Sequence, residues 1–250
     1  MRIHFKNISK AFGKKIVLDD IDLHLEPGNT YCILGKNGAG KTTLMNLLLQ
    51  LSGPTKGELI YDGTSLEELP QSLKMRIGAM SEDNPLIEEL TGRQYFKLYG
   101  QLYGLPRNDM KKRVDDLTSY FFDDPDDLKK RLSAFSTGMK KKIGLMASVL
   151  HTPDLLVLDE PFSGLDPVAA KMTIDFIKAY QNGNRTIFLS SHDLAYVAKV
   201  VTHLAVLDEG KIVFAGTLQD FTNHGQSEID SALLEVLQPD TRDLGGIEWF

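Results

Sequence analysis

The sequence predicts an α/β protein in which a mixed sheet has an antiparallel part and an α-helical subdomain is inserted into the core. Three observations support this fold class. Short apolar segments broken by Gly and Pro fill the first third of the chain, as in β-strands. Apolar residues recur at helical spacing from about residue 91 to residue 150. After Pro153, strand-like and helix-like segments alternate, as they do in α/β cores.

The elements can be placed in chain order. We expect strands over 3–8, 18–25, 31–34, 58–61 and 76–80. The helical stretch has two apolar faces, the first made by Tyr95, Leu98, Tyr99 and Leu102 and the second by Val114, Leu117 and Phe121. Later strands are expected over 155–158, 186–190, 204–207 and 212–214, and helices over 167–180, 194–200 and 227–237.

These elements divide the chain into four segments. The first part of the core is expected over 1–83, the helical subdomain over 84–150, the second part of the core over 151–216, and a C-terminal extension over 217–250. In the second part, Asp208-Glu209-Gly210-Lys211 predicts a hairpin turn, because Gly allows the positive φ that such turns require.

Composition excludes several classes of protein. The 250 residues hold 28 Lys+Arg and 34 Asp+Glu, a formal net charge of -6, which argues against coating of nucleic acid. One cysteine, Cys32, excludes a disulfide framework and suits a reducing compartment. No segment has the 18 apolar residues of a membrane span, and the amino terminus lacks the apolar stretch of a signal peptide. We therefore expect any membrane association to depend on a partner.

A phosphate-binding loop follows the third expected strand. Residues 35–42 match G-x-x-x-x-G-K-[ST] between a strand and a helix, the context that the motif requires. Backbone N–H groups and the helix dipole can surround a phosphate, Lys41 adds a charge, and Thr42 can ligate Mg²⁺. The alternative is a Gly-rich turn that binds nothing. The interpretation indicates a P-loop NTPase core, with nucleotide contacts from Gly35, Lys36, Asn37, Gly38, Ala39, Gly40, Lys41, Thr42 and Thr43.

A second motif, at 155–160, is an apolar strand that ends in two acids. Adjacent carboxylates repel one another and lose hydration at such a position, unless a cation lies beside them. Asp159 is therefore expected to hold Mg²⁺, and Glu160 to polarise the water that attacks the γ-phosphate. The alternative is a strand end with two solvated acids.

The third motif decides the class. Phe135-Ser136-Thr137-Gly138-Met139 opens a helix, and with the two motifs above it resembles the ATP-binding cassette family, specifically the nucleotide-binding subunit of an ABC transporter. The family's signature usually reads L-S-G-G-Q, so this chain keeps Ser136 and Gly138 and has Thr137 and Met139 at two variable places. Similar variants occur in exporter-like members. Alone, such a helix start is only a good N-cap.

The resemblance, which covers about residues 3–220, implies further roles. Asp166 matches the family's D-loop aspartate, and His192 matches the switch histidine that contacts the γ-phosphate. Phe12 matches the aromatic on which adenine stacks, an interaction of about 1–3 kcal/mol that tolerates any base. The alternative for Phe12 is a core position, and for His192 an ordinary helix-capping neighbour. The other five histidines are taken as ordinary.

One position departs from the family pattern. The lid loop after the 76–80 strand usually begins with Gln, whereas Glu82 stands there in this chain. A carboxylate can also ligate Mg²⁺, but it raises the local negative charge when the metal is absent. Glu82 is therefore expected to act in catalysis and metal binding, and to make hydrolysis more strongly dependent on Mg²⁺.

Three other features are interpreted as structural. The acidic run at 123–127 lacks the ligand pattern of a calcium loop and is expected to be a solvated turn and helix start. The run at 140–142, Lys140-Lys141-Lys142, is expected to be the solvated face of the signature helix. The apolar end at 245–250 is expected to dock on the chain's own surface or on a partner.

Taken together, the resemblance implies a subunit that hydrolyses ATP with Mg²⁺ and powers transport, with a lean towards export. It implies a dimer, with identical subunits favoured, in which each ATP lies between the phosphate loop of one chain and the signature of the other. It also implies a separate integral membrane subunit, a place on the cytoplasmic face of the membrane, and no nucleic-acid partner. The alternatives are a soluble ABC-type ATPase acting on nucleic acid or the ribosome, and an unrelated P-loop kinase or GTPase.

Overall fold

The computed structural model describes residues 1–65 and 70–237. The last part of the expected C-terminal extension, from residue 238 onward and including the apolar end at 245–250, lies outside the described residues. Within those described, no helix combines the length and the apolar character needed to cross a bilayer.

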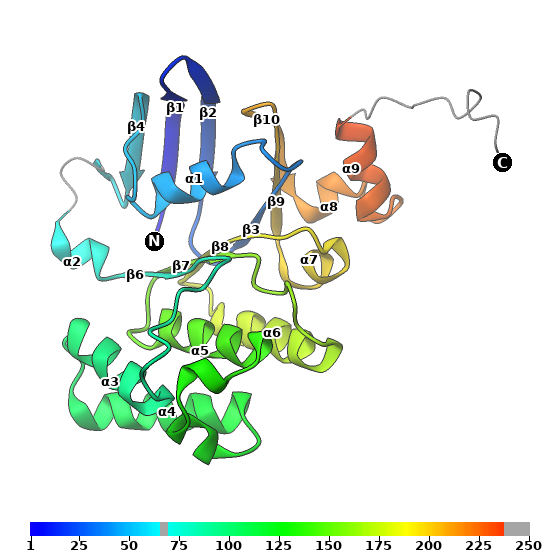
Figure 1. Ribbon diagram of the computed structural model, residues 1–250. Helices are drawn as coiled ribbons and strands as arrows, with labels where there is room; N and C mark the ends of the chain where they lie inside the picture. Colours follow the sequence, from blue (N-terminus) through cyan, green and yellow to red (C-terminus); the bar gives the residue numbers. More distant parts are fainter. Residues whose placement is uncertain (66–69, 238–250) are drawn as a thin grey trace, which may run out of the picture.

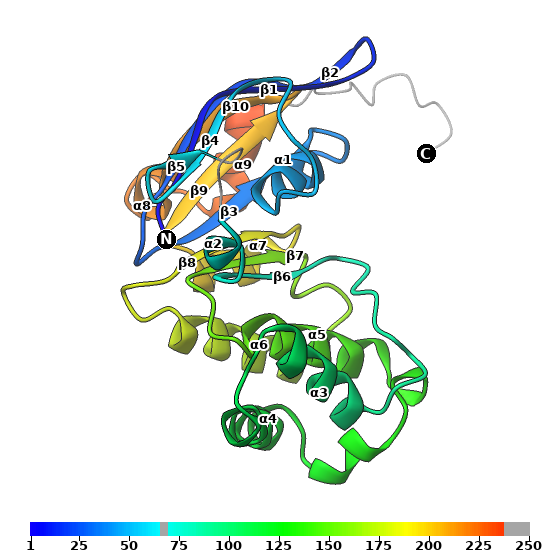
Figure 2. The ribbon, with the colours of Figure 1, turned by 90° about the vertical axis from the view of Figure 1, so that its left-hand side faces the viewer.

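Two sheets form the core (Figures 1 and 2). The antiparallel sheet has the order β2-β1-β4-β5, with β1 at Ile3–Phe12, β2 at Lys15–Leu25, β4 at Lys56–Tyr61 and β5 at Thr64–Ser65. The second sheet has the order β10-β9-β3-β8-β7-β6 and is parallel except for β10. Its strands are β3 (Thr30–Leu34), β6 (Ile77–Met80), β7 (Leu155–Asp159), β8 (Thr186–Ser190), β9 (His203–Asp208) and β10 (Lys211–Thr217).

The helices lie on both faces of the second sheet. On the side of the antiparallel sheet is α1 (Lys41–Leu48), and α2 (Gln71–Lys74) precedes β6. The opposite side holds the helical subdomain, with α3 (Gly92–Leu102), α4 (Arg107–Phe121), η2 (Pro125–Lys129), η3 (Leu132–Ala134) and α5 (Thr137–Val149). The remaining helices are α6 (Pro167–Tyr180), α7 (Leu194–Val200), α8 (Leu218–Phe221) and α9 (Ile229–Leu237). The predicted fold class, an α/β core with an antiparallel part and a helical insertion, is confirmed.

The parallel strands divide their side chains between two hydrophobic cores. In β3, Tyr31 and Ile33 pack towards α1 and the antiparallel sheet, whereas Cys32 and Leu34 pack towards the helical subdomain. Side chains alternate because successive residues of a strand point to opposite faces. Both faces are covered, so these strands read in the sequence as continuous apolar runs.

Several of the expected element boundaries agree with the structure. Strand 186–190 and helices 167–180 and 194–200 have the predicted bounds. Strand β1 runs on to Phe12, and β2 begins already at Lys15, because these exposed ends pair with one another beyond the apolar pattern. The short elements α2 and β5 have no apolar period and were not predicted.

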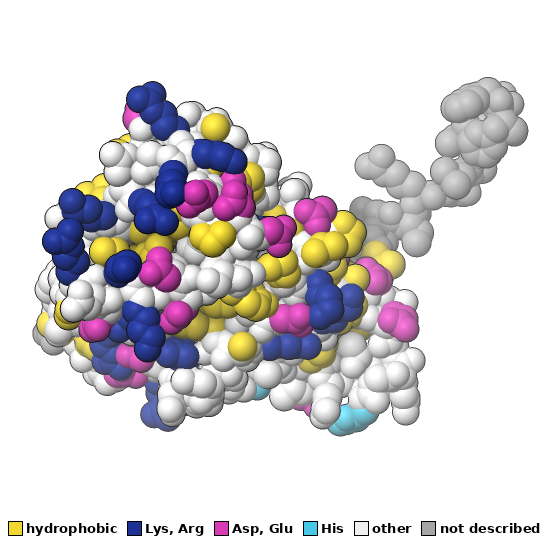
Figure 3. Space-filling view, turned by 90° about the horizontal axis from the view of Figure 1, so that it is seen from below, with side chains coloured by type: hydrophobic (Ala, Val, Ile, Leu, Met, Phe, Trp, Pro, Cys, Tyr) yellow, Lys and Arg dark blue, Asp and Glu magenta, His cyan; other side chains and the backbone are white. Residues whose placement is uncertain are grey.

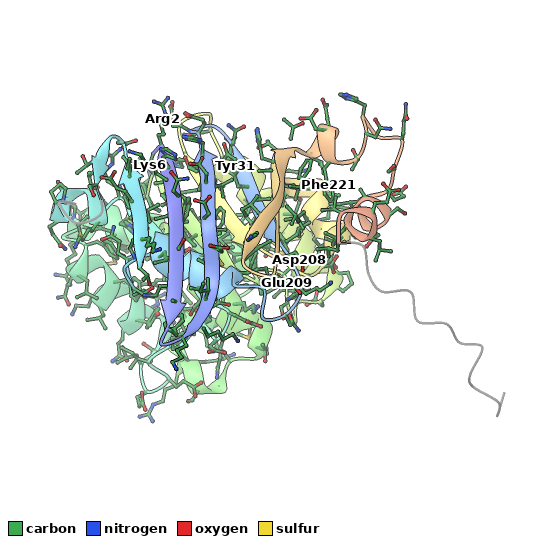
Figure 4. The ribbon with its side chains drawn as sticks, turned by 90° about the horizontal axis from the view of Figure 1, so that it is seen from above. Arg2, Lys6, Tyr31, Asp208, Glu209 and Phe221 are labelled. Atoms are coloured by element: carbon green, nitrogen blue, oxygen red, sulfur yellow. The ribbon has the colours of Figure 1, made fainter. Side chains whose placement is uncertain are left out.

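The predicted hairpin turn joins β9 to β10. Glu209 has φ 45 and Gly210 has φ 81, so both central residues are left-handed, as the two-residue turn requires. A Cβ on Gly210 would lie 2.6 Å from the Val17 carbonyl oxygen, which explains the glycine. Figure 4 shows Asp208 and Glu209 at this turn, beside the antiparallel sheet.

The expectation for the run at 140–142 is wrong. Lys141 is buried at 7% exposure, and the Nζ atom of half-buried Lys142 donates to the Phe121 carbonyl oxygen. Lys140 is also half-buried and pairs with Glu88. Helix α5 is packed between the second sheet and the other helices, so it presents no broad solvated face.

Candidate active site

The phosphate loop occupies residues 35–40 between β3 and α1. Gly40 is the N-cap of α1, with φ 113, and a Cβ there would lie 2.8 Å from Leu18 Cδ2. A Cβ on Gly35 would lie 2.2 Å from the Leu207 carbonyl oxygen. The loop therefore passes against neighbouring strands so closely that only glycine fits at these two positions.

Lys41 is folded back over its own loop. Its Nζ atom donates to the carbonyl oxygens of Gly35 at 2.6 Å and Lys36 at 3.2 Å. Burial lowers the pKa of this half-buried ammonium, and the charges of Glu160 and Asp159 oppose that shift. The ammonium is thus held at the loop, near the strand ends that carry the two acids.

The other loop residues divide between an exposed side and a buried side. Lys36, Asn37, Gly38 and Thr42 are exposed, whereas Thr43 is half-buried and Ala39 is packed in the core. The Lys36 ammonium lies 3.9 Å from an Asp208 carboxylate oxygen. The exposed side of the loop is therefore open to a ligand, and the buried side anchors it. The nucleotide contacts expected of this loop stay predictions.

Asp159 ends β7, and a buried serine orients it. The Ser190 hydroxyl, at the end of neighbouring β8, donates to an Asp159 carboxylate oxygen. The same Ser190 oxygen accepts a hydrogen bond from the Glu160 N–H at 3.1 Å. Ser190 thus holds two consecutive acidic residues at the carboxyl ends of the strands.

Glu160 follows Asp159 in an unusual conformation. Its φ is 48, a left-handed value that costs a non-glycine residue about 1–3 kcal/mol. Its side chain is 8% exposed, and Oε2 accepts from the His192 N–H at 3.2 Å. Oε1 lies 3.4 Å from His192 Nε2, yet it is buried without a hydrogen-bond partner among the residues described. A buried, unsatisfied carboxylate oxygen is what a base that binds a water would present.

The electrostatics of Glu160 agree with this interpretation. Burial raises the pKa of the Glu160 carboxyl, and the charges of Glu82 and Asp159 raise it further. His192 acts in the opposite direction through its charge and its N–H. A raised pKa makes the carboxylate a stronger base than an ordinary exposed glutamate.

A pocket of about 560 Å³ adjoins this carboxylate. Glu82, Glu160 and His192 line it together with the segment at 163–165. The structure therefore brings three of the four predicted catalytic residues, Glu82, Glu160 and His192, to one pocket, whereas Lys41 is not among its lining residues. His192 itself is 57% exposed at its side chain, which leaves its ring free for an incoming ligand.

The signature residues lie apart from the phosphate loop. Ser136 is the N-cap of α5, and its hydroxyl accepts from the Met139 N–H at 3.2 Å. Gly138 is nearest to Leu165, at 3.7 Å for an added Cβ, and Thr137 approaches Gly164. Ser136 is exposed, whereas Met139 packs on the core. The start of this helix thus contacts the segment at 164–165, and Ser136 itself remains exposed.

Asp166 has a structural role in this chain. It is the N-cap of α6, and Oδ1 accepts from the N–H groups of Val168 and Ala169, each at 2.9 Å. The Ala169 N–H is the main cause of the lowered pKa of its carboxyl. Capping alone explains an aspartate at this position. Its role towards nucleotide stays a prediction.

Phe12 ends β1 with its side chain in solvent. The residue is 57% exposed, which excludes the alternative that it belongs to the core. The Lys10 ammonium lies 5.1 Å from the ring centroid, within the range of a cation–π interaction. A flat ligand can reach this ring, but stacking of adenine stays a prediction.

The donor types of Thr42, Asp159 and Glu82 fit Mg²⁺. All three present oxygen, one from a hydroxyl and two from carboxylates, and hard divalent cations prefer oxygen ligands. None of these three side chains offers nitrogen or sulfur as a ligand atom. The clustering of acidic charge around Lys41, from Glu160, Asp159 and Glu82, also favours a cation there.

Two groups outside the site do not form metal centres. His4, Asp22 and His24 bring ligand atoms within 4.8 Å of one another, but the two rings stack at 3.7 Å and 23°. Stacked rings do not aim their in-plane nitrogens at one ion. In the acidic run, Asp124 caps η2 by accepting from the Asp126 N–H, which confirms the expected turn and helix start.

Three residues of the site were not foreseen. Ser190 orients both acids, Asp230 of α9 lines the pocket beside His192, and Lys141 donates to the Glu160 carbonyl oxygen. The burial of Lys141 could have been predicted from helical spacing, because Lys141 shares a helical face with buried Leu145 and Ser148. No local pattern distinguishes Ser190 or Asp230 from other polar residues.

Comparison with known proteins agrees with this geometry. Residues 18–163 match the family model described as ABC transporter. The chain is similar to the ABC transporter ATP-binding protein NatA of Bacillus subtilis (strain 168), at 32% identity over 86% of this chain and 88% of the relative. The bacitracin transport ATP-binding protein BcrA of Enterococcus faecalis is 34% identical over 84% of this chain and 68% of its own length.

A solved structure extends the likeness to three dimensions. The ATP-binding subunit of an ABC transporter superposes with a TM-score of 0.84 at 28% identity, over 94% of this chain and 99% of the other. The family model covers more than half of the chain, and the matched segment contains the phosphate loop, the signature helix and both acids. The chain therefore belongs to the ABC transporter family, as an ATP-binding cassette and an ATPase.

Proposed function

We propose that this cassette hydrolyses ATP to power transport, in the direction of export, through separate membrane-spanning subunits. Two identical chains close around two ATP molecules and open again after hydrolysis. The observation that carries the proposal is the exposed start of α5: Ser136 is exposed and its neighbours lie against residues 164–165, whereas Lys41 is folded over the phosphate loop.

Within one chain, the phosphate loop and Lys41 bind the ATP phosphates. Thr42, Asp159 and Glu82 would hold Mg²⁺, which neutralises phosphate charge when it is bound. Glu160 orients the attacking water and accepts its proton at Oε1, which has no hydrogen-bond partner within the described part of the chain. His192 contacts the γ-phosphate from its exposed position across the same pocket. Phe12 stacks on the adenine.

The second chain completes the site. Helix α5 begins at an exposed Ser136, so its first N–H groups and its dipole are available to an anion that arrives from outside the chain. The γ-phosphate of the partner's ATP has the required charge. Loss of that phosphate after hydrolysis removes the bridge, and the dimer opens.

The membrane subunit docks in a groove between the core and the helical subdomain. This groove, of about 420 Å³, is lined by Leu51, by β6 through Ile77, by α3 through Tyr99 and by Tyr103, which follows α3. Leu51 is 72% exposed and lies with Tyr99 and Tyr103 in this groove, so apolar surface there is available to a partner. Docking there places the cassette on the cytoplasmic face of the membrane.

Export is supported by a relative that is named for it, the Nod factor export ATP-binding protein I of Cupriavidus metallidurans, which is 29% identical over 94% of this chain. The alternative, an ATPase acting on nucleic acid or the ribosome, is less favoured. The chain has a net charge of -6, and the surface seen from below carries acidic and basic side chains interspersed (Figure 3). A nucleic-acid surface is usually basic.

Co-purification tests the transport role. The tagged chain is expressed in its native host at native level, and detergent-solubilised membranes are examined for a multi-span protein bound to it. We expect Leu51→Asp to abolish this association, because a charge in an apolar groove loses hydration on docking. Val213→Asp, a change at an exposed apolar residue of β10, is the matched control and retains the partner.

Two outcomes would contradict the proposal. If the Leu51→Asp variant retains the membrane partner, the docking site is not this groove. Co-purification of RNA or ribosomal proteins in place of a membrane protein favours the alternative function.

A further inference from the structure

Lys141 is a buried cation whose ammonium group donates to a main-chain carbonyl oxygen instead of a carboxylate. It lies in the second turn of α5, is 7% exposed, and its Nζ atom donates to the Glu160 carbonyl oxygen at 2.6 Å. Burial of a lysine costs free energy, so such a residue is retained where its contact has a use. That contact is with the residue which we propose to be the general base.

The backbone of Glu160 is held on both sides. Its N–H donates to Ser190 Oγ at 3.1 Å, and its carbonyl oxygen accepts from Lys141. The residue has φ 48, a conformation that glutamate rarely adopts unless its surroundings impose it. The direction of the Glu160 side chain follows from this backbone conformation, and Lys141 is one of the two groups that maintain it.

The same helix start also contacts the lid segment. The side-chain N–H of Asn84 donates to the Lys140 carbonyl oxygen at 2.7 Å, two residues beyond Glu82 in the chain. One turn earlier, the exposed Ser136 caps the start of the helix. The first two turns of α5 therefore carry the signature, an anchor of the Glu82 segment and the anchor of Glu160.

We propose that Lys141 is a positioning residue which holds Glu160 in its hydrolytic orientation and ties that orientation to the signature helix. When the partner's ATP draws the start of α5 towards it, the Lys141 contact moves with the helix and sets the base of this chain's own site. One helix thus links the two ATP sites. This inference rests on the proposed function, in which the signature serves the nucleotide of the other chain.

The acids around Lys141 give it a second effect on the same site. Glu160, Glu82 and Asp159 act on its charge from the strand ends and the lid segment. A fixed positive charge among three acids reduces their mutual repulsion. The neighbour Lys140 differs, because its side chain pairs with Glu88 and makes no recorded contact with these three acids.

The experiment compares three variants of the full chain: Lys141→Met, Lys141→Arg and, as matched control, Lys140→Met. ATPase kinetics, ATP affinity and the thermal unfolding midpoint are measured for each. We expect Lys141→Met to bind ATP with unchanged affinity and to lose kcat by roughly 10- to 100-fold, since a small displacement of a catalytic group has effects of this size. Lys141→Arg, which keeps the donor, restores most of kcat, and Lys140→Met stays within about twofold of wild type.

Other results overturn the inference. A folded Lys141→Met with kcat within twofold of wild type excludes a positioning role, and Lys141→Ala decides the matter if the Met variant is insoluble. If neither apolar variant folds, Lys141 acts in stability and the inference fails. An inactive wild-type chain, in contrast, would contradict the proposed function itself.

Discussion

The two ends of the nucleotide machinery differ in how their residues are held. At the carboxyl ends of β7 and β8, Glu160 and Asp159 are oriented by contacts from other elements, and the Glu160 side chain is 8% exposed. At the start of α5, Ser136 is exposed and its recorded hydrogen bond is to its own helix. The first region is thus held by contacts between distant segments, and the second is exposed and capped locally.

This difference indicates where each region finds its ligand. Groups that are buried and oriented before a ligand arrives can perform chemistry without reorganising. An exposed helix start can recognise an anion but has nothing to orient one in its own chain. Substitutions in the two regions should therefore affect different steps, hydrolysis in the first and dimer closure in the second.

The largest expected effect is that of Glu160→Gln. Removal of the base should lower kcat by roughly 10²–10⁴ while ATP binding is retained. ATP then stays intact and the dimer accumulates, which size-exclusion chromatography with and without ATP would detect. Glu89→Gln, at an exposed glutamate, is the control. An ATPase rate within a few-fold of wild type would remove Glu160 from the role of base.

A pH profile sharpens the same test. The base acts only when it is deprotonated, and burial raises its pKa above the ordinary value of a glutamate. Activity should therefore fall with decreasing pH at a higher pH than an ordinary carboxylate would cause. The acid limb of kcat/KM should be absent from the residual activity of Glu160→Gln.

A smaller effect is expected from Ser136→Glu. A carboxylate at the helix start repels the partner's γ-phosphate, so ATP-dependent dimerisation should be lost and hydrolysis should fall by roughly 10- to 100-fold. ATP binding to the monomer should be unchanged, as measured by equilibrium titration. Ser133→Glu, a nearby exposed serine, is the control. If Ser136→Glu weakens ATP binding by the monomer, the signature serves its own chain and the comparison fails.

The smallest effect is expected from Glu82→Gln. The charge of Glu82 adds to the repulsion among the acids when Mg²⁺ is absent, so its removal should make hydrolysis less dependent on Mg²⁺. ATPase activity measured across a Mg²⁺ titration would show a shallower dependence, with a shift of a few-fold in the half-maximal concentration. Asp83→Asn is the control. An unchanged Mg²⁺ requirement would exclude Glu82 from the metal site.

Much of the fold could be predicted from sequence, because the relevant signals are local. Continuous apolar runs at 31–34 and 155–158 indicated strands, and the residues of both runs are buried. Glycines at 35 and 40 marked a loop that no larger residue can form. The dependence on local signals also explains why α2 and β5 were not predicted, since these short elements have no apolar periodicity.

The sequence by itself determined the class of protein, since a phosphate loop, a signature and an acidic strand end in this order are specific chemistry at specific spacing. Only the tertiary structure decided that Lys141 is buried against Glu160, that Ser190 holds both acids, and that Asp166 also caps a helix. The physical reason is the distance along the chain between the residues that define each feature. Motifs are read from neighbours along the chain, whereas a buried polar group is defined by partners that the fold brings from distant segments.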